Sequence, residues 1–449
     1  MIDKYQFRQI LAAFSAGLSI LTVGCFIGWT SPTLEKLDLT KEQKSLLASI
    51  HEVGHLISPI PAGLSIDRHG RLPCLILSGV LTVIGWVIII MTRNLYHLYF
   101  SRFLFGITMG ITFTVVPTYV GEILDTNIRG VCFTLLPLFL NSGHLVEFVL
   151  GPLVSYDTFA YLNIIVPIVF LMSCFFLFES PYYYIYVNND RKANDIFRRI
   201  KPSYNYNEIK QSIKIVKYNN YENVKILVSK CMNRNFLCVV LLNVVQRFSG
   251  MSAMVAFSHH ILQNNIYSIV FSVIVLFFSL VSTLVISRVS RRKLLLLSCL
   301  GCCLSHLFSC VITWLHYNNI LHFTYDYNFM LFTSICVYAS IYSIGLGPMP
   351  NILQGELLPL DLRGIGSCLC SIVFTVASFT VTNLFLKVNS LFINFLIYSL
   401  NCLIGFIVFY IYLINTDNKE LYEIHHNFDG VEKKRDDNEA EPEVSKHST

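Results

Sequence analysis

The sequence pattern that most clearly suggests a chemical function is His51-Glu52-Val-Gly-His55, which spells H-E-x-x-H. On a helix, two imidazoles four residues apart share one face and can hold a zinc ion, while the carboxylate between them acts as a general base. The pattern would then indicate a metalloprotease, including one that works inside a membrane. Zinc catalysis usually needs a third protein ligand, and no Asp or Glu motif elsewhere clearly supplies one. We therefore expect no metal site here.

No other pattern indicates an enzyme. The chain has 14 cysteines, and almost all of them lie in apolar stretches. Their spacing matches neither a zinc knuckle nor a redox C-x-x-C pair, so we expect small buried side chains. The chain also has no G-x4-G-K-[ST] sequence, which would cradle nucleotide phosphates. We therefore predict a protein that is not an enzyme, with no cofactor and no obligate protein partner.

The composition indicates a membrane protein, with the lipid bilayer as its main partner. The 449 residues are 54% hydrophobic and only 14% charged, whereas a soluble globular protein carries roughly 25% charged residues. The formal net charge of +5 is mild. The basic residues do not form one stripe, which argues against a nucleic acid as partner.

Twelve apolar stretches are long enough to cross a bilayer. A spanning helix needs about 20 mostly apolar residues, and a segment of this kind satisfies its backbone in lipid only as a helix. We therefore predict an all-α membrane protein with twelve spans, near 9–29, 46–66, 73–92, 97–121, 130–152, 160–179, 236–261, 267–287, 294–315, 329–350, 365–387 and 391–414.

The loops between the predicted spans carry Lys and Arg asymmetrically. Most of the 33 basic residues fall on the side of the membrane where the chain begins, and such a bias marks the cytoplasmic face. Both termini are therefore predicted to be cytoplasmic. The chain divides into a six-helix bundle over 1–181, a cytoplasmic linker with short helices over 182–235, a second six-helix bundle over 236–414 and a disordered tail over 415–449.

Charged and glycine-containing motifs recur at corresponding cytoplasmic turns. Segment 63–71 (GLSIDRHGR) follows the second span, and segment 287–292 (SRVSRR) follows the eighth. We expect Gly63 to let two helices approach closely and Gly70 to adopt a positive φ. Repetition between two halves is typical of carriers that enclose a central site near the midplane of the membrane.

With further motifs at 102–110 (RFLFGITMG), 179–183 (ESPYY) and 345–350 (GLGPMP), the chain resembles the sugar porters of the major facilitator superfamily. Together with GWTSP at 28–32, these motifs make it most similar to the insect facilitated trehalose transporter-like proteins. The resemblance implies two pseudo-symmetric six-helix bundles in a plasma membrane. It also implies facilitated, uniport passage of a small-molecule sugar, such as a hexose or trehalose, by alternating access.

The resemblance also gives the cytoplasmic charges a gating role. In the family, such residues link the halves when the cytoplasmic side is shut, and exposed pairs worth about 0–1 kcal/mol each suit a gate that must open. The alternative is that they only anchor the topology. The matching residues are Asp67, Arg68, Arg71, Glu122, Arg129 and Glu179 in the first half, and Arg288, Arg291, Glu356 and Arg363 in the second.

A sugar offers hydroxyls and no charge, so its site needs neutral hydrogen-bonding side chains within the spans. Gln246 matches a principal sugar contact of the family, whereas Arg247 and Ser252 stand where relatives have Gln and Asn. Each unmatched buried group costs about 1–3 kcal/mol, so the alternative of a sugar sensor or inactive paralogue stays open. The predicted substrate-binding residues are Gln246, Arg247, Ser252, Asn351, Thr375 and Ser378.

The resemblance also bears on coupling. Proton-driven relatives carry an Asp near the end of the first span, which faces an Arg of the fourth. Thr30 takes that place here and Arg102 is the matching Arg, so uniport is favoured over proton symport. The alternative for Arg102 is that its side chain snorkels outward.

The H-E-x-x-H residues have a second interpretation within this fold. They would lie in the outer half of the second span, and His144 and Glu147 would lie in the outer half of the fifth. Together they would line the outer part of the pathway. Because histidine titrates near pH 6.5, transport would then depend on pH.

Overall fold

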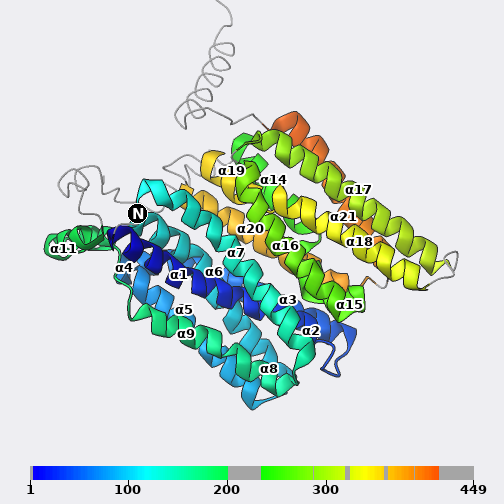
Figure 1. Cartoon of the computed structure of the whole chain (residues 1–449), viewed down its shortest axis with the longest axis horizontal. Coiled ribbons are helices and arrows are strands. Elements are labelled where there is room, and N and C mark those ends of the chain that lie inside the picture. The colour runs from blue at the N-terminus through cyan, green and yellow to red at the C-terminus, as the bar shows by residue number, and fades with distance from the viewer. Residues whose placement is uncertain are drawn as a thin grey trace, which may run out of the picture.

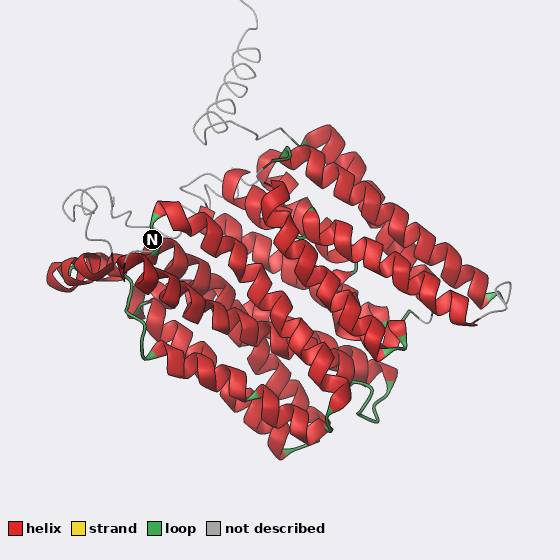
Figure 2. Ribbon diagram, in the orientation of Figure 1, coloured by secondary structure: helices red, strands yellow, loops and turns green. Residues whose placement is uncertain are grey.

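A computed structural model describes residues 4–200, 234–286, 288–318, 324–357, 363–388 and 390–413, apart from the side chains of 126–131, 133–134, 234–235, 324–326, 355–357, 363–365 and 367. Every regular element in these ranges is a helix (Figure 2). The predicted tail and most of the predicted linker lie outside the described residues.

The helices form two groups that lie side by side (Figure 1). The first group comprises α1 (Lys4–Gly28), α2 (Thr30–Thr33), α3 (Lys41–Ile57), α4 (Pro59–His69), α5 (Arg71–Met91), α6 (Leu95–Ile123), α7 (Thr126–Leu153), α8 (Tyr156–Asn163) and α9 (Ile165–Cys174).

The second group begins after two short helices at one end of the molecule. These short helices are α10 (Pro181–Tyr186) and α11 (Asp190–Ile200). The second group comprises α14 (Arg234–Phe248), α15 (Met251–Leu262), α16 (Asn265–Ile286), α17 (Arg291–Tyr317), α18 (Thr324–Ile344), α19 (Met349–Leu357), α20 (Arg363–Phe385) and α21 (Leu391–Tyr412).

Eleven stretches in the described part of the chain are long and apolar enough to cross a membrane. The expected second span, 46–66, is the exception, although its helices are present. It consists of α3 and α4, which follow end to end with a break at Ser58 and Pro59. Proline has no N–H to continue the helical ladder, which explains the break. The buried polar residues of α3, described below, explain why this span is less apolar than the others.

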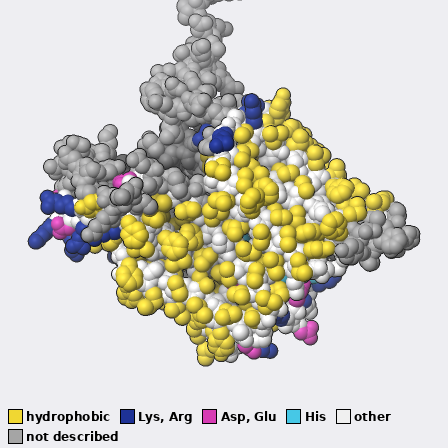
Figure 3. All heavy atoms as spheres, in the orientation of Figure 1, with side chains coloured by type: hydrophobic (Ala, Val, Ile, Leu, Met, Phe, Trp, Pro, Cys, Tyr) yellow, Lys and Arg dark blue, Asp and Glu magenta, His cyan; other side chains and the backbone are white. Residues whose placement is uncertain are grey.

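The outer surface of the molecule fits a bilayer. Apolar side chains cover most of the face in Figure 3, whereas Lys and Arg gather at the ends of the bundle. Large apolar residues such as Met91, Phe175 and Ile266 are exposed. Soluble monomers rarely expose apolar patches of this extent, so the surface is one that lipid would cover.

The two groups meet through a few helix pairs. The main contacts are those of α3 with α20, α7 with α16, and α2 with α15. Within the first group, α3 packs very closely on α6. A Cβ placed on Gly54 would overlap the carbonyl oxygen of Phe103, and one placed on Gly106 would overlap the carbonyl oxygen of His51. These two glycines therefore fix the spacing that buries the polar face of α3.

The two glycines singled out in segment 63–71 have different outcomes. Gly70 has φ = 101° and ends α4, as expected. The expected role of Gly63 is wrong, because a Cβ there would meet no heavy atom within 4 Å. Helix α4 presents this position to open space, and the close approach lies one helix earlier, at Gly54.

This contrast gives a test of the helix contact. Alanine favours a helix over glycine by about 1 kcal/mol, but overlap with a backbone carbonyl costs about 1–3 kcal/mol or more. We expect Gly54→Ala to lower the melting temperature of the purified protein in detergent. Gly63→Ala is the matched control and should leave it unchanged or slightly higher. Equal melting temperatures for both variants would contradict the contact.

Candidate functional site

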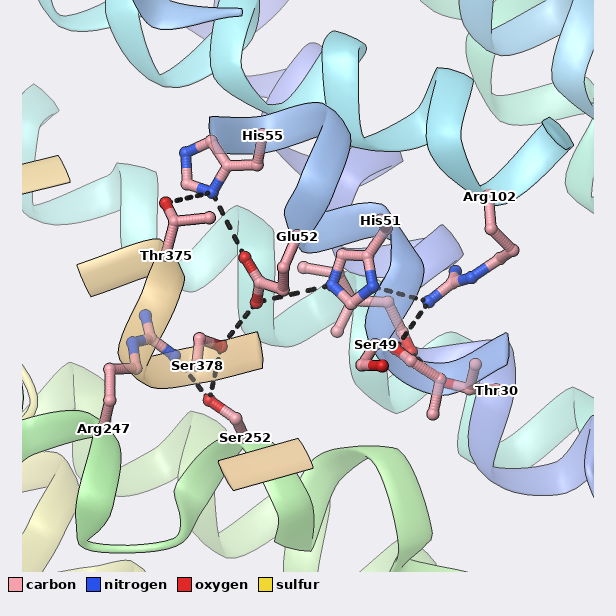
Figure 4. A network of polar contacts seen from close by, with 12 residues as sticks. Thr30, Ser49, His51, Glu52, His55, Arg102, Arg247, Ser252, Thr375 and Ser378 are labelled. Atoms are coloured by element: carbon pink, nitrogen blue, oxygen red, sulfur yellow. Dashed lines mark hydrogen bonds and ion pairs between the residues drawn. The ribbon is translucent and has the colours of Figure 1, made fainter. Parts of the chain in front are cut away.

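Glu52 lies at the centre of a buried polar network that joins the two groups of helices (Figure 4). The residue is only 4% exposed. Ser378 of α20 donates to Oε1 at 2.5 Å. His51 Nε2 lies 3.6 Å from Oε1, and His55 Nδ1 lies 3.4 Å from Oε2. The carboxylate is therefore surrounded by polar partners from α3 itself and from the opposite half.

On one side, the network continues to Arg102 of α6, which is fully buried. Its guanidinium donates to His51 Nδ1 at 3.1 Å and to the backbone carbonyl oxygens of Phe26, Leu47 and Ala48. The alternative that Arg102 snorkels outward is therefore wrong, since backbone carbonyls of α1 and α3 supply acceptors in the interior. Thr30 donates instead to the carbonyl oxygen of Ile27.

On the other side, the network continues through α20 to Arg247 of α14. Ser378 Oγ and Ser252 Oγ lie 3.1 Å apart, and Arg247 donates to Ser252 Oγ at 2.9 Å. The guanidinium also lies over the ring of Phe374, 3.5 Å from its centroid. This is a cation–π contact. Arg247, Ser252 and Ser378, which were predicted as separate substrate contacts, thus form one chain.

His55 completes the inter-half contacts at this level. Its Nδ1 lies 3.2 Å from Thr375 Oγ1, and its ring packs edge-on against Phe374. The two imidazoles of the H-E-x-x-H pattern thus turn to different partners. Among the described residues, no cluster of His, Cys, Asp or Glu is arranged to hold a metal. The pattern supplies a polar link between the halves.

The other predicted substrate residues lie apart from this chain. Gln246 is buried in α14 next to Arg247, and its Nε2 donates to the carbonyl oxygen of Gly347 at 2.6 Å. Asn351 is exposed near the start of α19. The structure thus brings Arg247, Ser252, Thr375 and Ser378 together, leaves Gln246 beside them and does not bring in Asn351.

Further hydrogen bonds join the halves closer to one end of the bundle, where α2 lies. Ser31 of α2 contacts Ser258 Oγ and His259 Nδ1 of α15, each at 2.8 Å. Asn383 of α20 donates to Ser49 Oγ at 3.1 Å and accepts through its carbonyl from Ser45. The motifs had not predicted these residues. The sequence feature that could have predicted them is a hydroxyl or amide side chain inside an apolar span, because such side chains commonly join membrane helices by hydrogen bonds.

His144 and Glu147 occupy a different place from the one expected. Both lie on the side of α7 that faces α1, because a Cβ on Gly28 would touch them. Glu147 accepts from Asn163 Nδ2 of α8 at 3.0 Å. The structure therefore places them against α1 and α8, and no contact in the described structure joins them to His51 or His55. They are three residues apart in α7 and so lie on the same face of that helix.

The comparisons with known proteins decide the family. A family model described as "Sugar (and other) transporter" matches residues 9–428. The chain belongs to this sugar transporter family. Membership confirms the resemblance to sugar porters and the prediction of a transporter that is not an enzyme.

Known relatives and solved structures agree with this. The facilitated trehalose transporter Tret1 of Bombyx mori is 24% identical over 94% of this chain and 86% of its own length. The sugar transporter ERD6-like 7 of Arabidopsis thaliana is 26% identical over 92% of both chains. The inward-open structure of the xylose transporter XylE from E. coli has a TM-score of 0.77 at 18% identity, and covers 92% of this chain and 98% of its own. The last comparison confirms the predicted major facilitator fold.

In this sugar transporter, several of the predicted gate residues of the first half lie around the turn between α4 and α5. Arg71 is buried and pairs with Glu122 of α6 at 2.7 Å, whereas exposed Asp67 lies 4.0 Å away. Glu179 accepts from the backbone N–H groups of Arg71 and Leu72 at 2.9 and 3.0 Å. An acceptor placed there caps the first turn of α5. Glu179 therefore has a structural role beside any role in gating.

Two of the remaining predicted gate residues, Arg68 and Arg288, are exposed. Arg291 begins α17, whose N-cap is Ser290. The side chains of Arg129, Glu356 and Arg363 lie outside the described set.

The two acids of this turn should respond differently to substitution. Glu179→Ala leaves two backbone N–H groups of α5 without their acceptor, at about 1–3 kcal/mol each. We expect a clear fall in melting temperature in detergent. Asp67→Ala is the matched control and should change it little, because this carboxylate is 76% exposed and lies 4.0 Å from Arg71, and exposed ion pairs contribute little. A fall of the same size in both variants would argue against the cap.

Proposed function

We propose that the chain carries a sugar, such as a hexose or trehalose, across the plasma membrane by facilitated alternating access, with both termini cytoplasmic. The observation that carries this proposal is the set of inter-half hydrogen bonds that runs from Glu52 and Ser378 at the centre to Ser49 and Asn383 farther out. The family, and the sugar transport named for the trehalose and xylose transporters, support the substrate class. The Lys and Arg bias supports the orientation.

The inter-half bonds have the strength that a rocking carrier needs. Most of them are single hydrogen bonds between neutral side chains, which average about 0.6 kcal/mol in measured membrane proteins. Several together hold the outer ends closed, yet each breaks readily when the halves rotate. The cytoplasmic charges would act in the same way on the opposite side, as the proposed gate.

Gln246 is the best candidate for a direct sugar contact. It is buried, uncharged and next to the central network, and its bond to the carbonyl oxygen of Gly347 can be exchanged for a bond to a hydroxyl. Gly347 lies just before α19, where the backbone leaves the helical ladder. A sugar hydroxyl could therefore replace either partner without leaving a buried group unpaired.

One specific observation favours proton symport as a second candidate. Glu52 is linked to Arg102 through His51, so a carboxylate of the second span stands close to the arginine of the fourth. Protonation of Glu52 would weaken its bonds to His51 and His55. Against this, Arg102 is already held by backbone carbonyls and does not depend on a carboxylate.

Uptake into proteoliposomes tests the function. We expect saturable uptake of labelled glucose or trehalose without a proton gradient, and its loss in Gln246→Ala, because a buried partner of the sugar hydroxyls is removed. Gln43→Ala, which changes a partly exposed amide at the start of α3, should retain uptake. A strict need for a proton gradient would favour symport. Ligand binding with no flux of any sugar would favour a sensor.

Cross-linking tests the alternating opening. The side chains of Ser49 and Asn383 meet across the two halves, so the double variant Ser49→Cys, Asn383→Cys places two thiols where a disulfide would join the halves. We expect oxidation to stop uptake, because the halves can no longer part on the outer side, and a reductant to restore it. Each single cysteine variant serves as control. Full uptake in the cross-linked protein would contradict opening at this place.

A further inference from the structure

The two arginines inside the bundle are partnered very differently. Arg102 is fully buried, and its N–H groups reach one imidazole nitrogen and three backbone carbonyls. Arg247 is only partly buried and has one hydrogen-bond acceptor among the described residues, Ser252 Oγ. Its Nε is shielded from solvent and finds no acceptor within the described structure. A guanidinium has five N–H donors, so most of the donors of Arg247 have no acceptor within the described ranges of the chain.

The charge balance of the network points the same way. Arg102 and Arg247 contribute two positive charges, and Glu52 contributes one negative charge. His51 accepts a hydrogen bond from Arg102 through Nδ1, which fits a neutral imidazole whose Nε2–H faces Glu52. The oxygens of Glu52 are occupied by His51, His55 and Ser378, and no ion pair joins them to Arg247. The network thus has an excess of about one positive charge near Arg247, and an unpaired charge in a membrane interior is costly.

The surroundings of Arg247 also contain neutral groups suited to hydroxyls. Gln246 is its neighbour in α14, and Ser252 and Ser378 lie within hydrogen-bonding distance of each other beside it. The Phe374 ring covers one face of the guanidinium. That stacking holds the planar fork in place, and a carboxylate binds the edge of such a fork through two parallel hydrogen bonds.

We infer that Arg247, with Gln246, Ser252 and Ser378, forms the recognition site for a hydroxylated organic monoanion, a sugar carrying a carboxylate. This inference rests on the proposed transport function and names its substrate class. A single negative charge neutralises the excess of the network, whereas a phosphate dianion would exceed it. The carboxylate engages Arg247, and the hydroxyls engage Gln246 and the two serines.

Binding to the purified, full-length protein tests the inference independently of transport. Glucuronate and gluconate are the carboxylate probes, glucose is the neutral probe and glucose 6-phosphate is the dianionic probe. We expect the carboxylates to raise the melting temperature of the wild-type protein in detergent more than glucose or glucose 6-phosphate does. The loss of a charged hydrogen-bonding pair should weaken glucuronate binding in Arg247→Gln by roughly tenfold or more. Glucose binding should be kept or improved, since glutamine suits a neutral hydroxyl.

Two further variants separate the effect of the Arg247 charge and shape from a general effect of removing an arginine. Arg247→Lys keeps the charge without the planar fork and should bind glucuronate between wild type and Arg247→Gln. Arg93→Gln is the matched control, because Arg93 is an exposed arginine paired with Asp157 at the outer surface. It should bind glucuronate as the wild type does.

The outcomes distinguish this inference from the proposed function. Binding of glucuronate that depends on Arg247, without uptake of any probe, would support the site and reject the transport function. Uptake of glucose with no glucuronate binding would support transport and overturn the site. A preference for glucose 6-phosphate, or equal loss of glucose and glucuronate binding in Arg247→Gln, would also overturn it.

Discussion

The interior of a membrane protein has little capacity to stabilise a carboxylate. The architecture of this chain depends on supplying polar partners to the buried carboxylate of Glu52. The cost of a buried charge is high unless hydrogen bonds and opposite charges surround it. Three of the partners of Glu52 come from both halves of the molecule: two histidines from its own helix and Ser378 from α20. The contact between the halves is thus also the solvation shell of this carboxylate.

This arrangement explains why the closest helix packing lies beside it. Gly54 and Gly106 let α3 lie against α6, and that proximity brings His51 within reach of Arg102. A larger residue at either glycine would move α3 outward and separate the two side chains. Close packing of α3 on α6 is therefore needed for the polar side chains to find their partners, and the two glycines make that packing possible.

Much of the fold could be predicted from the sequence, because the length of an apolar stretch is a strong signal of a membrane-spanning helix. All twelve expected spans have helices, even the second, whose polar residues weaken that signal. The side-chain partners were harder to predict. The motifs placed Ser252, Thr375 and Ser378 in the site as separate contacts, but did not show that Glu52 links them. Partnerships across more than 300 residues depend on helix rotation, which residue types alone do not specify.

The two ends of the bundle are built from different interactions. Neutral hydroxyl and amide groups join the halves at one end, as at Ser31 and Asn383. Charged groups gather at the turn between α4 and α5, where Glu179 caps α5 and Arg71 pairs with Glu122. Salt screens buried ion pairs much less than exposed ones. Because Arg71 is only 3% exposed and Glu122 17% exposed, this pair should persist at high ionic strength, as the neutral bonds do.

The polarity of the second span also has a consequence for biogenesis. A charged residue at the centre of an inserting helix costs about 2.5–3.5 kcal/mol on insertion scales. Helix α3 carries Glu52 between two histidines and lacks the hydropathy of the other spans, so it would partition poorly on its own. Its stabilising partner Arg102 leaves the ribosome 51 residues after His51. The second span should therefore stay beside the insertion machinery until the fourth arrives, and the pair should enter the lipid together.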